Sequence, residues 1–256
     1  MAQYSFGAGQ LWGIPTADAF GNAIAANVAS PVLFGVLQEA SVEIDFDTKM
    51  LYGQNQFPVA VGRGKGKIGV KAKMAQLNGS LINSLFFGQT MTSGIYSTVY
   101  DTTGAVVPST PFQITPTVPS SGTWAVDLGV RDSQGIPLVR VASAPATGQY
   151  SVAAGVYTFN TAQQGQTVFI SYQYTATSTT AKRSTVQNVP MGYAPTFRAD
   201  LTTIFQGKSF TLTLPNCISS KLQFATKLDD FNVPDFDFDG FADAAGNVMT
   251  WATTEN

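Results

Sequence analysis

Residues 41–88 read SVEIDFDTKMLYGQNQFPVAVGRGKGKIGVKAKMAQLNGSLINSLFFG and contain two runs in which charged residues alternate with uncharged ones. The first run, Val42 to Asp47, places acids on odd positions, and the second, Val59 to Met74, places bases on odd positions. Side chains alternate between the two faces of a strand, so each run has one face of a single charge sign. The stretch predicts a long antiparallel hairpin.

The stretch from Tyr52 to Pro58 is expected to reverse the chain about Asn55 and to fix the register of this hairpin. Cross-strand ion pairs contribute only about 0.2–1 kcal/mol each, so we expect them to set register more than stability. Tyr52 and Phe57, together with the paired residues, are candidates for contacts between subunits. The predicted pairs are Asp45 with Lys65, Glu43 with Lys67, and Asp47 with Arg63.

One helix is predicted after the hairpin. Met74, Leu81 and Leu85 belong to a set of apolar residues that recur at helical spacing, which favours a helix from Met74 to Phe87. Asn78 is a residue type that caps a shorter helix, and Gly88 is a suitable stop.

Composition argues against an enzyme. The chain of 256 residues has no histidine, which excludes imidazole-based acid–base catalysis and histidine metal sites. The single cysteine, Cys217, cannot form an intrachain disulfide and is expected to be a buried apolar residue. The net charge of −2 gives no bulk attraction to nucleic acid. No cofactor and no metal is expected.

Charged residues make up 12% of the chain, roughly half the usual share of a soluble domain. This scarcity indicates that much of the surface is covered in the working state. No leader peptide and no membrane-spanning run is evident, so synthesis in a cytoplasm-like compartment is expected.

The composition also indicates two domains, because charged residues become rare after Gly88. Short strands separated by Gly and Pro turns predict a small sandwich-like β domain over 95–180, inserted into a parent domain of 1–94 and 181–256. The parent is expected to begin with an irregular arm of about forty residues that has one short strand near Val32 to Leu37. The fold class is all-β with one short helix.

A run of alternating aspartates and phenylalanines, Asp235 to Gly240, matches several positions of a calcium-binding loop. Gly246 stands where the closing glutamate is required, and the flanks are strand-like. The favoured interpretation is a strand with Phe236 and Phe238 in the core. Its aspartates, which then face solvent or a channel, are Asp235, Asp237 and Asp239.

Three stretches together resemble the bacteriophage tail tube (major tail) proteins: residues 6–9 with the letters FGAG, residues 41–88, and the stretch that runs from Gly207 through Phe238. The resemblance covers about two thirds of the chain, everything except the insert. It implies a β-barrel or sandwich flanked by one helix, assembled as stacked, usually hexameric, rings around a channel for DNA. The hairpin and the N-terminal arm would contact the neighbouring ring.

The insert departs from the minimal pattern of this family. Some tails carry extra immunoglobulin-like domains on the outside, and 95–180 is expected to be such a domain. An outward domain would obstruct a contractile sheath, which favours a non-contractile tail. The partners would be further copies of the chain and other tail proteins, in a virion tail assembled in the host cytoplasm. DNA would pass without specific binding, and aspartates lining the bore would repel it. The lumen-facing candidates are Asp235, Asp237 and Asp239.

Two alternatives stay open. One is another virion component, such as a head–tail connector or a capsid decoration protein. The other is a carbohydrate- or surface-binding module centred on the insert, whose aromatic residues are candidates for stacking on sugars. These residues are Trp124, Tyr150, Tyr157, Tyr172 and Tyr174.

Overall fold

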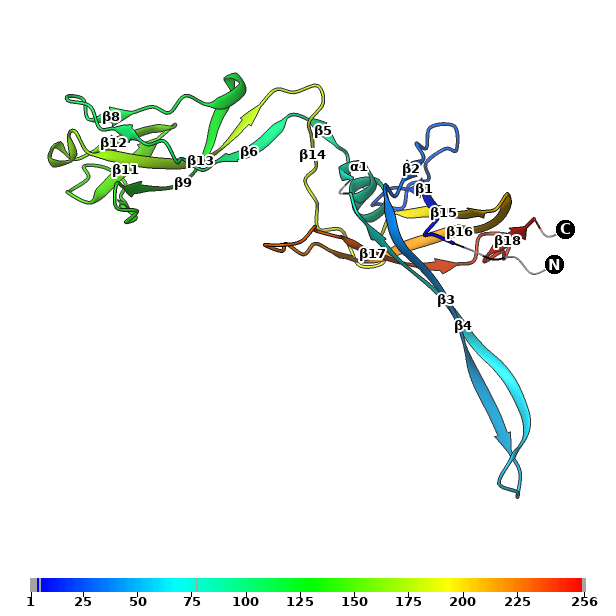
Figure 1. The fold of residues 1–256 in the computed structure, drawn as a ribbon. Coiled ribbons are helices and arrows are strands. Elements are labelled where there is room, and N and C mark those ends of the chain that lie inside the picture. Colours follow the sequence, from blue (N-terminus) through cyan, green and yellow to red (C-terminus); the bar gives the residue numbers. More distant parts are fainter. Residues whose placement is uncertain (1–3, 5, 77, 255–256) are drawn as a thin grey trace. The chain divides into compact units, whose positions relative to one another are not determined.

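The computed structural model describes residues 4, 6–76 and 78–254. The chain divides into two compact units: unit 1 is Met1–Thr90 with Ser184–Asn256, and unit 2 is Met91–Arg183. Both consist mainly of strands (Figure 1), which confirms the predicted all-β class with one short helix. The predicted insert, 95–180, falls within the bounds of unit 2. Its immunoglobulin-like character stays a prediction.

Unit 1 is built on one eight-stranded antiparallel sheet. The strand order is β2-β1-β15-β16-β17-β4-β3, and β18 also pairs with β16. Strands distant in sequence are therefore neighbours, because β17 lies beside β4. The strands are β1 (Gln10–Ala17), β2 (Val32–Leu33), β3 (Leu37–Tyr52), β4 (Pro58–Met74), β15 (Thr196–Phe205), β16 (Lys208–Gln223), β17 (Asp235–Phe241) and β18 (Thr250–Thr253).

The predicted hairpin of β3 and β4 forms, but its register differs from the prediction. Asp45 pairs with Lys67, two positions from the predicted partner Lys65. Two β-bulges cause the shift, because each places an extra residue in β4. Only next to the turn, where Tyr52 pairs with Pro58, does the predicted register hold. The other two predicted pairs are also wrong: Glu43 faces Gly69, and Arg63 faces Thr48 instead of Asp47.

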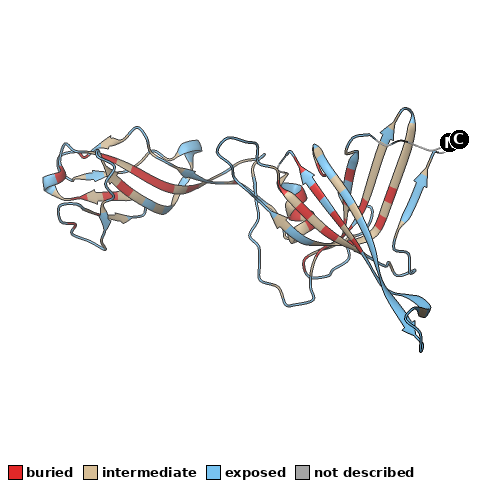
Figure 2. Ribbon diagram, turned by 60° about the horizontal axis from the view of Figure 1, so that its bottom comes forward, coloured by how far each residue is buried: buried red, intermediate tan, exposed pale blue. Residues whose placement is uncertain are grey.

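Alternation in the inner half of β4 places its even-numbered side chains in the core of unit 1. Ile68, Val70, Ala72 and Met74 are buried there (Figure 2). The predicted core position of Phe236 and Phe238 is confirmed, with exposures of 0% and 1%. Core phenylalanine rings lie edge-to-face at centroid distances near 5–6 Å, which is a favourable aromatic geometry.

The helix of unit 1 starts later than predicted. Met74 is the last residue of β4, so a helix from Met74 is wrong. Asn78 is the N-cap, and its side chain accepts hydrogen bonds from the amides of Ser80 and Leu81. The chain then forms α1 (Gly79–Leu81) and a π-helical turn, η1 (Ile82–Phe87).

Gly88 ends this helix. It has a φ of 58°, and a Cβ there would lie 2.6 Å from the amide nitrogen of Ala19, so no larger residue fits. The fully buried side chains of Leu81 and Leu85 pack against the core face of the sheet.

The N-terminal region is more regular than predicted. In place of an irregular arm with one short strand, β1 (Gln10–Ala17) lies inside the sheet between β2 and β15. The short strand expected near Val32 exists as β2. Leu11, on β1, is buried in the core.

Unit 2 has its own core between two four-stranded sheets, one of order β10-β11-β12-β8 and one containing β6, β13, β7 and β9. This arrangement is sandwich-like. A separate two-stranded ladder joins β5 to β14. The strands are β5 (Thr92–Ser93), β6 (Ile95–Val99), β7 (Ala105–Val106), β8 (Gln113–Ile114), β9 (Thr123–Asp132), β10 (Val139–Arg140), β11 (Gln149–Ala153), β12 (Val156–Phe159), β13 (Thr167–Ala176) and β14 (Lys182–Arg183), with short 3-10 turns η2 (Pro119–Ser121) and η3 (Thr161–Gln163).

Candidate functional site

Three features of unit 1 are candidates for function: a charged sheet face, a projecting hairpin arm and a pocket beside the helix. The charged face is the side of β3, β4, β17 and β16 opposite the core. Paired residues of neighbouring strands share a face, so the register brings its side chains together. Its charged members are Glu39, Glu43, Asp45, Lys67, Lys71, Lys73, Lys221, Asp235, Asp237 and Asp239.

Lysines of β4 form the middle row of this face, and acids flank them. Lys73 pairs with Glu39 on one side and Asp235 on the other, and Lys71 pairs with Asp237. The Lys73 Nζ lies 2.6 Å from a carboxylate oxygen of Glu39. This hydrogen bond raises the pKa of Lys73 above its ordinary value, although the side chain is solvent-exposed.

Lys67 extends the same pattern toward the arm. Its Nζ lies 3.4 Å from Asp239 Oδ1, and its strand partner on the other side is Asp45. Exposed pairs of this kind contribute little to stability. Their effect is to neutralise the lysine row, since the face has six carboxylates and four ammonium groups and a net charge of −2.

Residues predicted for two different roles therefore lie on one surface. Glu43, Asp45 and Lys67, expected at subunit contacts, lie on the same face as the three lumen candidates of β17. Those three aspartates form a row along a strand and do not converge on one point, which the calcium-loop alternative requires. Among the residues that the structure describes, no group of three or more His, Cys, Asp or Glu side chains is suited to hold a metal ion.

The hairpin arm is the part of β3 and β4 beyond the sheet, residues 46–66. β17 accompanies β4 only from Ile68 to Lys73, so the arm is a two-stranded ribbon (Figure 1). Its apolar side chains are largely exposed, and Phe57 at the tip is 79% exposed. The other exposed apolar residues of the arm are Phe46, Met50, Leu51, Tyr52, Val59 and Val61.

The bulge between Phe46 and Thr48 moves Arg63 to the apolar side of the arm. Its guanidinium carbon lies 4.6 Å from the centroid of the Phe46 ring. An extra residue in one strand resets its alternation, so the prediction that Arg63 shares a face with the lysines of β4 is wrong. Gly66 permits the arrangement, because a Cβ there would lie 2.8 Å from the Phe46 ring.

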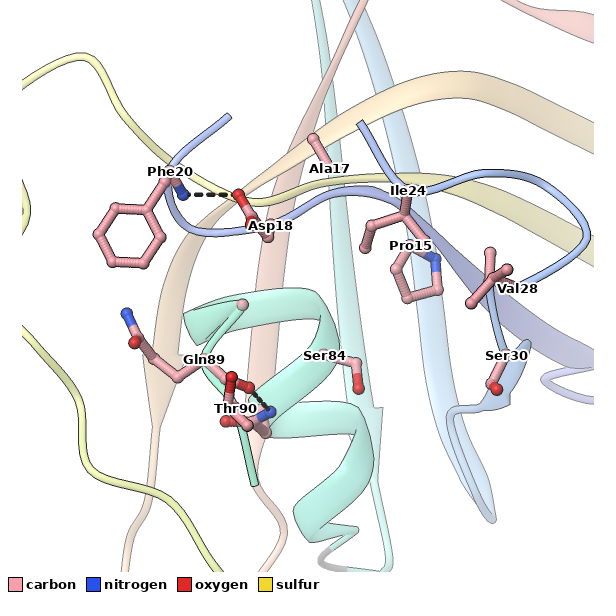
Figure 3. Close-up of a pocket in the computed structure, with 13 residues that line it drawn as sticks. Pro15, Ala17, Asp18, Phe20, Ile24, Val28, Ser30, Ser84, Gln89 and Thr90 are labelled. Carbon is pink, nitrogen blue, oxygen red and sulfur yellow. Dashed lines mark hydrogen bonds between the residues drawn. The ribbon is translucent and has the colours of Figure 1, made fainter. Parts of the chain in front are cut away.

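The helix pocket lies between η1 and the loops that follow β1, with a volume of about 350 Å³ (Figure 3). Pro15, Phe20, Ile24 and Val28 supply apolar lining. The carboxylate of Asp18 is already committed to the amides of Phe20 and Asn22. The polar lining is Ser30, Asn83, Ser84, Gln89 and Thr90.

Asn83 is the residue of this pocket that sequence reasoning missed. It is 6% exposed, and its Nδ2 donates to the carbonyl oxygen of Gln89. Its Oδ1 is buried and has no hydrogen-bond partner among the described residues. The available signal was one amide within the apolar segment from Leu81 to Phe86. A buried acceptor without a donor is unusual, so this atom needs an explanation.

Four of the five aromatic residues proposed for sugar binding are core residues of unit 2, and the fifth, Trp124, is partly buried against them. Tyr150, Tyr157, Tyr172 and Tyr174 are at most 8% exposed, so they form no exposed stacking platform. Two of them have a polar role that the sequence did not indicate, because the hydroxyls of Tyr150 and Tyr157 donate to the carboxylate of Asp127 at 2.7 and 3.1 Å.

Asp127 also accepts from the amide of Gly129 and lies 3.6 Å from Arg140. The hydroxyls are shielded from water, which raises the pKa of Tyr150 and Tyr157 well above the usual range. Asp127 therefore has hydrogen-bond partners for both of its carboxylate oxygens, and the network links strands within the core of unit 2. The predicted burial of Cys217 is also confirmed, and burial raises its pKa to about 12, so the thiol is unreactive.

Comparison with known proteins identifies no family: no protein-family model and no curated protein matches the chain. Within the described part of the chain, no helix is both long and apolar enough to cross a membrane. The features of unit 1 that bear on function are the charged face, the hairpin arm and the helix pocket.

Proposed function

We propose that the chain is a virion structural protein that forms a bacteriophage tail tube, with further copies of itself as its main partner. In this proposal subunits assemble into rings, hexameric as in the family it resembles, and the rings stack around a channel for DNA. The work is mechanical, and no catalytic residue is assigned. The tube is built in the host cytoplasm and joins other tail proteins in the virion.

The hairpin arm is the observation that carries this proposal. An isolated two-stranded hairpin is marginally stable in water, and the arm exposes a row of apolar side chains. Contiguous exposed apolar surface marks an interaction site. Met50 and Val61, a strand pair 52% and 61% exposed, gain a dry environment only when another chain covers them.

The edge of the sheet supports self-assembly in a second way. β3 is the terminal strand of the sheet, and its long outer edge has no partner among the described strands. Unpaired strand edges are templates for pairing with another chain. A subunit that joins copies through this edge forms a closed ring or an open filament, depending on whether the rotation closes.

The charged face suits a channel through which DNA must move. Unpaired lysines bind DNA phosphates strongly, because each contact releases counterions from the DNA. Such contacts would hold the DNA in the channel. Here carboxylates of β3 and β17 flank the lysines of β4, and the face keeps a net negative charge. In the proposed tube this face lines the channel, while the arm makes the contacts between subunits.

Negative-stain electron microscopy of the purified full chain tests the proposal. We expect tubes with a stain-filled channel and a regular axial repeat, formed without any other protein. A chain that stays monomeric at all concentrations contradicts the proposal. Monomers that bind only to capsids identify a decoration or connector protein instead.

A further inference from the structure

Unit 2 contains an arginine that is held in place by aromatic rings. Arg131 lies near the end of β9, on the face of its sheet opposite the core, and its strand partner on β13 is Phe169. Its guanidinium carbon lies 4.6 Å from the centroid of the Tyr100 ring and 5.8 Å from that of the Phe169 ring, which are cation–π distances. Its Nη2 donates to the backbone carbonyl oxygen of Asp101 at 3.1 Å. These contacts fix the position of the planar guanidinium group.

The charge of Arg131 has no carboxylate partner. The acids of unit 2 are Asp101, Asp127 and Asp132. The first and the last accept hydrogen bonds from backbone amides, and Asp127 belongs to the tyrosine network of the core. Among the described residues, Arg131 forms no ion pair, and its one hydrogen bond is the one to Asp101. Most of its N–H donors are therefore available to a ligand.

Arg131 lines a cavity of about 370 Å³ on this face of unit 2. Tyr100, which is 65% exposed, and Phe169 supply its aromatic lining. Asp132 orders the loop on another side, because its Oδ1 accepts from the amides of Gln134 and Ile136. The cavity thus combines one fixed cation with an exposed ring and small polar groups. The rest of the lining is Asp101, Thr102, Ser133, Gln134 and Gly135.

These groups match a sugar residue that carries one carboxylate. A guanidinium with a fixed plane binds a carboxylate through two parallel N–H···O bonds. Hydroxyl and amide side chains both donate and accept, so Thr102, Ser133 and Gln134 suit the hydroxyls of a sugar. The exposed ring of Tyr100 offers apolar contact area for the C–H groups of a sugar ring. A single cation is complementary to one negative charge, which disfavours a multiply charged phosphate ligand.

We propose that this cavity of unit 2 binds a hexuronic acid residue of an acidic polysaccharide, with Arg131 on the carboxylate and Tyr100 against the sugar ring. This binding function does not depend on the proposed tube. It assigns carbohydrate binding in unit 2 to an exposed face of the sheet, in place of the buried aromatic residues of the core.

Calorimetric titration of the full chain with trimers of galacturonate and of glucuronate tests the site. We expect at least one of them to bind, with one site per chain. The methyl ester of the bound trimer keeps the sugar rings and lacks the charge, so its affinity should be at least about tenfold lower. Sodium acetate supplies the carboxylate without the sugar and should not displace the trimer at equal concentration.

Three results of this titration overturn the proposal: no binding of either trimer, equal affinity for the ester, or displacement by equimolar acetate. The last would show a site for any carboxylate, including that of a peptide. None of them bears on tube formation, which is measured separately by microscopy.

Two variants and a matched control locate the site. Arg131→Lys keeps the positive charge but loses the planar pair of donors, so the affinity should fall at least about tenfold. Tyr100→Ala removes an exposed ring and should also weaken binding, and it keeps the test decisive if the Arg131 variant unfolds. Tyr96→Ala is the control, because Tyr96 is 52% exposed on β6 and does not line the cavity. Unchanged binding by Tyr100→Ala, or an equal loss in the Tyr96 variant, would overturn the assignment.

Thermal melts by circular dichroism accompany these titrations. The midpoints of the Tyr100 and Tyr96 variants should match that of the unmodified chain, because both side chains are exposed. A loss of binding at an unchanged midpoint is then a loss of the site and not of the fold.

Discussion

The inner and outer halves of the β3–β4 hairpin are both paired strands with alternating side chains, but they have different surroundings. In the inner half, even-numbered residues of β4 such as Val70 are buried under the helix and the phenylalanine cluster. In the outer half, residues such as Val61 are exposed, because neither a third strand nor a helix accompanies the ribbon. Alternation in the sequence predicts which side chains share a face. Whether that face is buried or exposed depends on the strands and helix that pack beside it.

The largest expected effect is on stability in the inner half. Phe236→Ala removes a fully buried ring that touches Phe34, Phe86 and Phe197. We expect unit 1 to lose about 3–5 kcal/mol of unfolding free energy in urea denaturation. Phe57→Ala, the matched change at the arm tip, should alter it by about 0.5 kcal/mol or less. Equal losses at both positions would show that the arm is packed in the free subunit.

The second effect is on assembly, through the outer half. Met50→Asp adds a charge to the exposed apolar row of the arm. The critical concentration for tube formation should rise at least tenfold, about 1.4 kcal/mol per subunit contact, with no change in subunit stability. Sedimentation measures it, and Gln38→Asp at the base of the same strand is the control. Unimpaired tubes from Met50→Asp would mean that the arm is not a contact.

The third effect separates the charged face from the arm by their response to DNA. Replacing Asp235, Asp237 and Asp239 by lysine removes the β17 acids that flank the lysines of β4 and makes the net charge of the face positive. Tubes of this variant should retain duplex DNA at low salt and release it as salt rises, because retention depends on phosphate neutralisation. Cosedimentation of DNA at two salt concentrations measures it.

Asp47→Lys in the arm is the control for this experiment and should leave DNA unbound. DNA retention by the arm variant alone would place the arm, and not the charged face, along the channel.

The smallest effect is the pH dependence of the inner ion pair. Glu39 raises the pKa of Lys73 above 10.5, so the folded state holds this proton more tightly than the unfolded state. The contribution is fully present below the unfolded pKa and is lost as the pH rises through the folded pKa. Glu39→Gln should flatten the decline of the melting midpoint as the pH rises above about 10.4, the unfolded pKa of lysine. Asp47→Asn in the arm should leave that decline unchanged. If Asp47→Asn flattens the decline and Glu39→Gln does not, the Lys73–Glu39 ion pair is not its cause.

Much of unit 1 was predictable where the determinants are local. Alternation predicted the hairpin and the core position of Phe236, and the apolar spacing predicted one helix. The helix start was wrong because Met74 continues β4, where its amide donates to Pro234, a residue far along the chain. A local apolar period does not reveal such a partner.

The register and the pocket depended on features that a pattern does not encode. The bulge beside Asp47 reset the alternation of β4, and packing of Phe46 over Gly66 accompanies it. The placement of β17 beside β4, which builds the charged face, is a pairing between strands more than a hundred and fifty residues apart. Asn83 became informative only when its lack of a partner was visible.

Hydrogen exchange of the backbone amides, measured on the free subunit and on assembled tubes, tests the central claim most directly. Exchange reports local opening, and the inner strands should be protected in both states. The amides of the arm, residues 46–66, should exchange quickly in the subunit and become protected in the tube. Arm amides that are as slow as the inner strands in the free subunit, or that stay fast after assembly, would contradict the claim that the arm is completed by another copy.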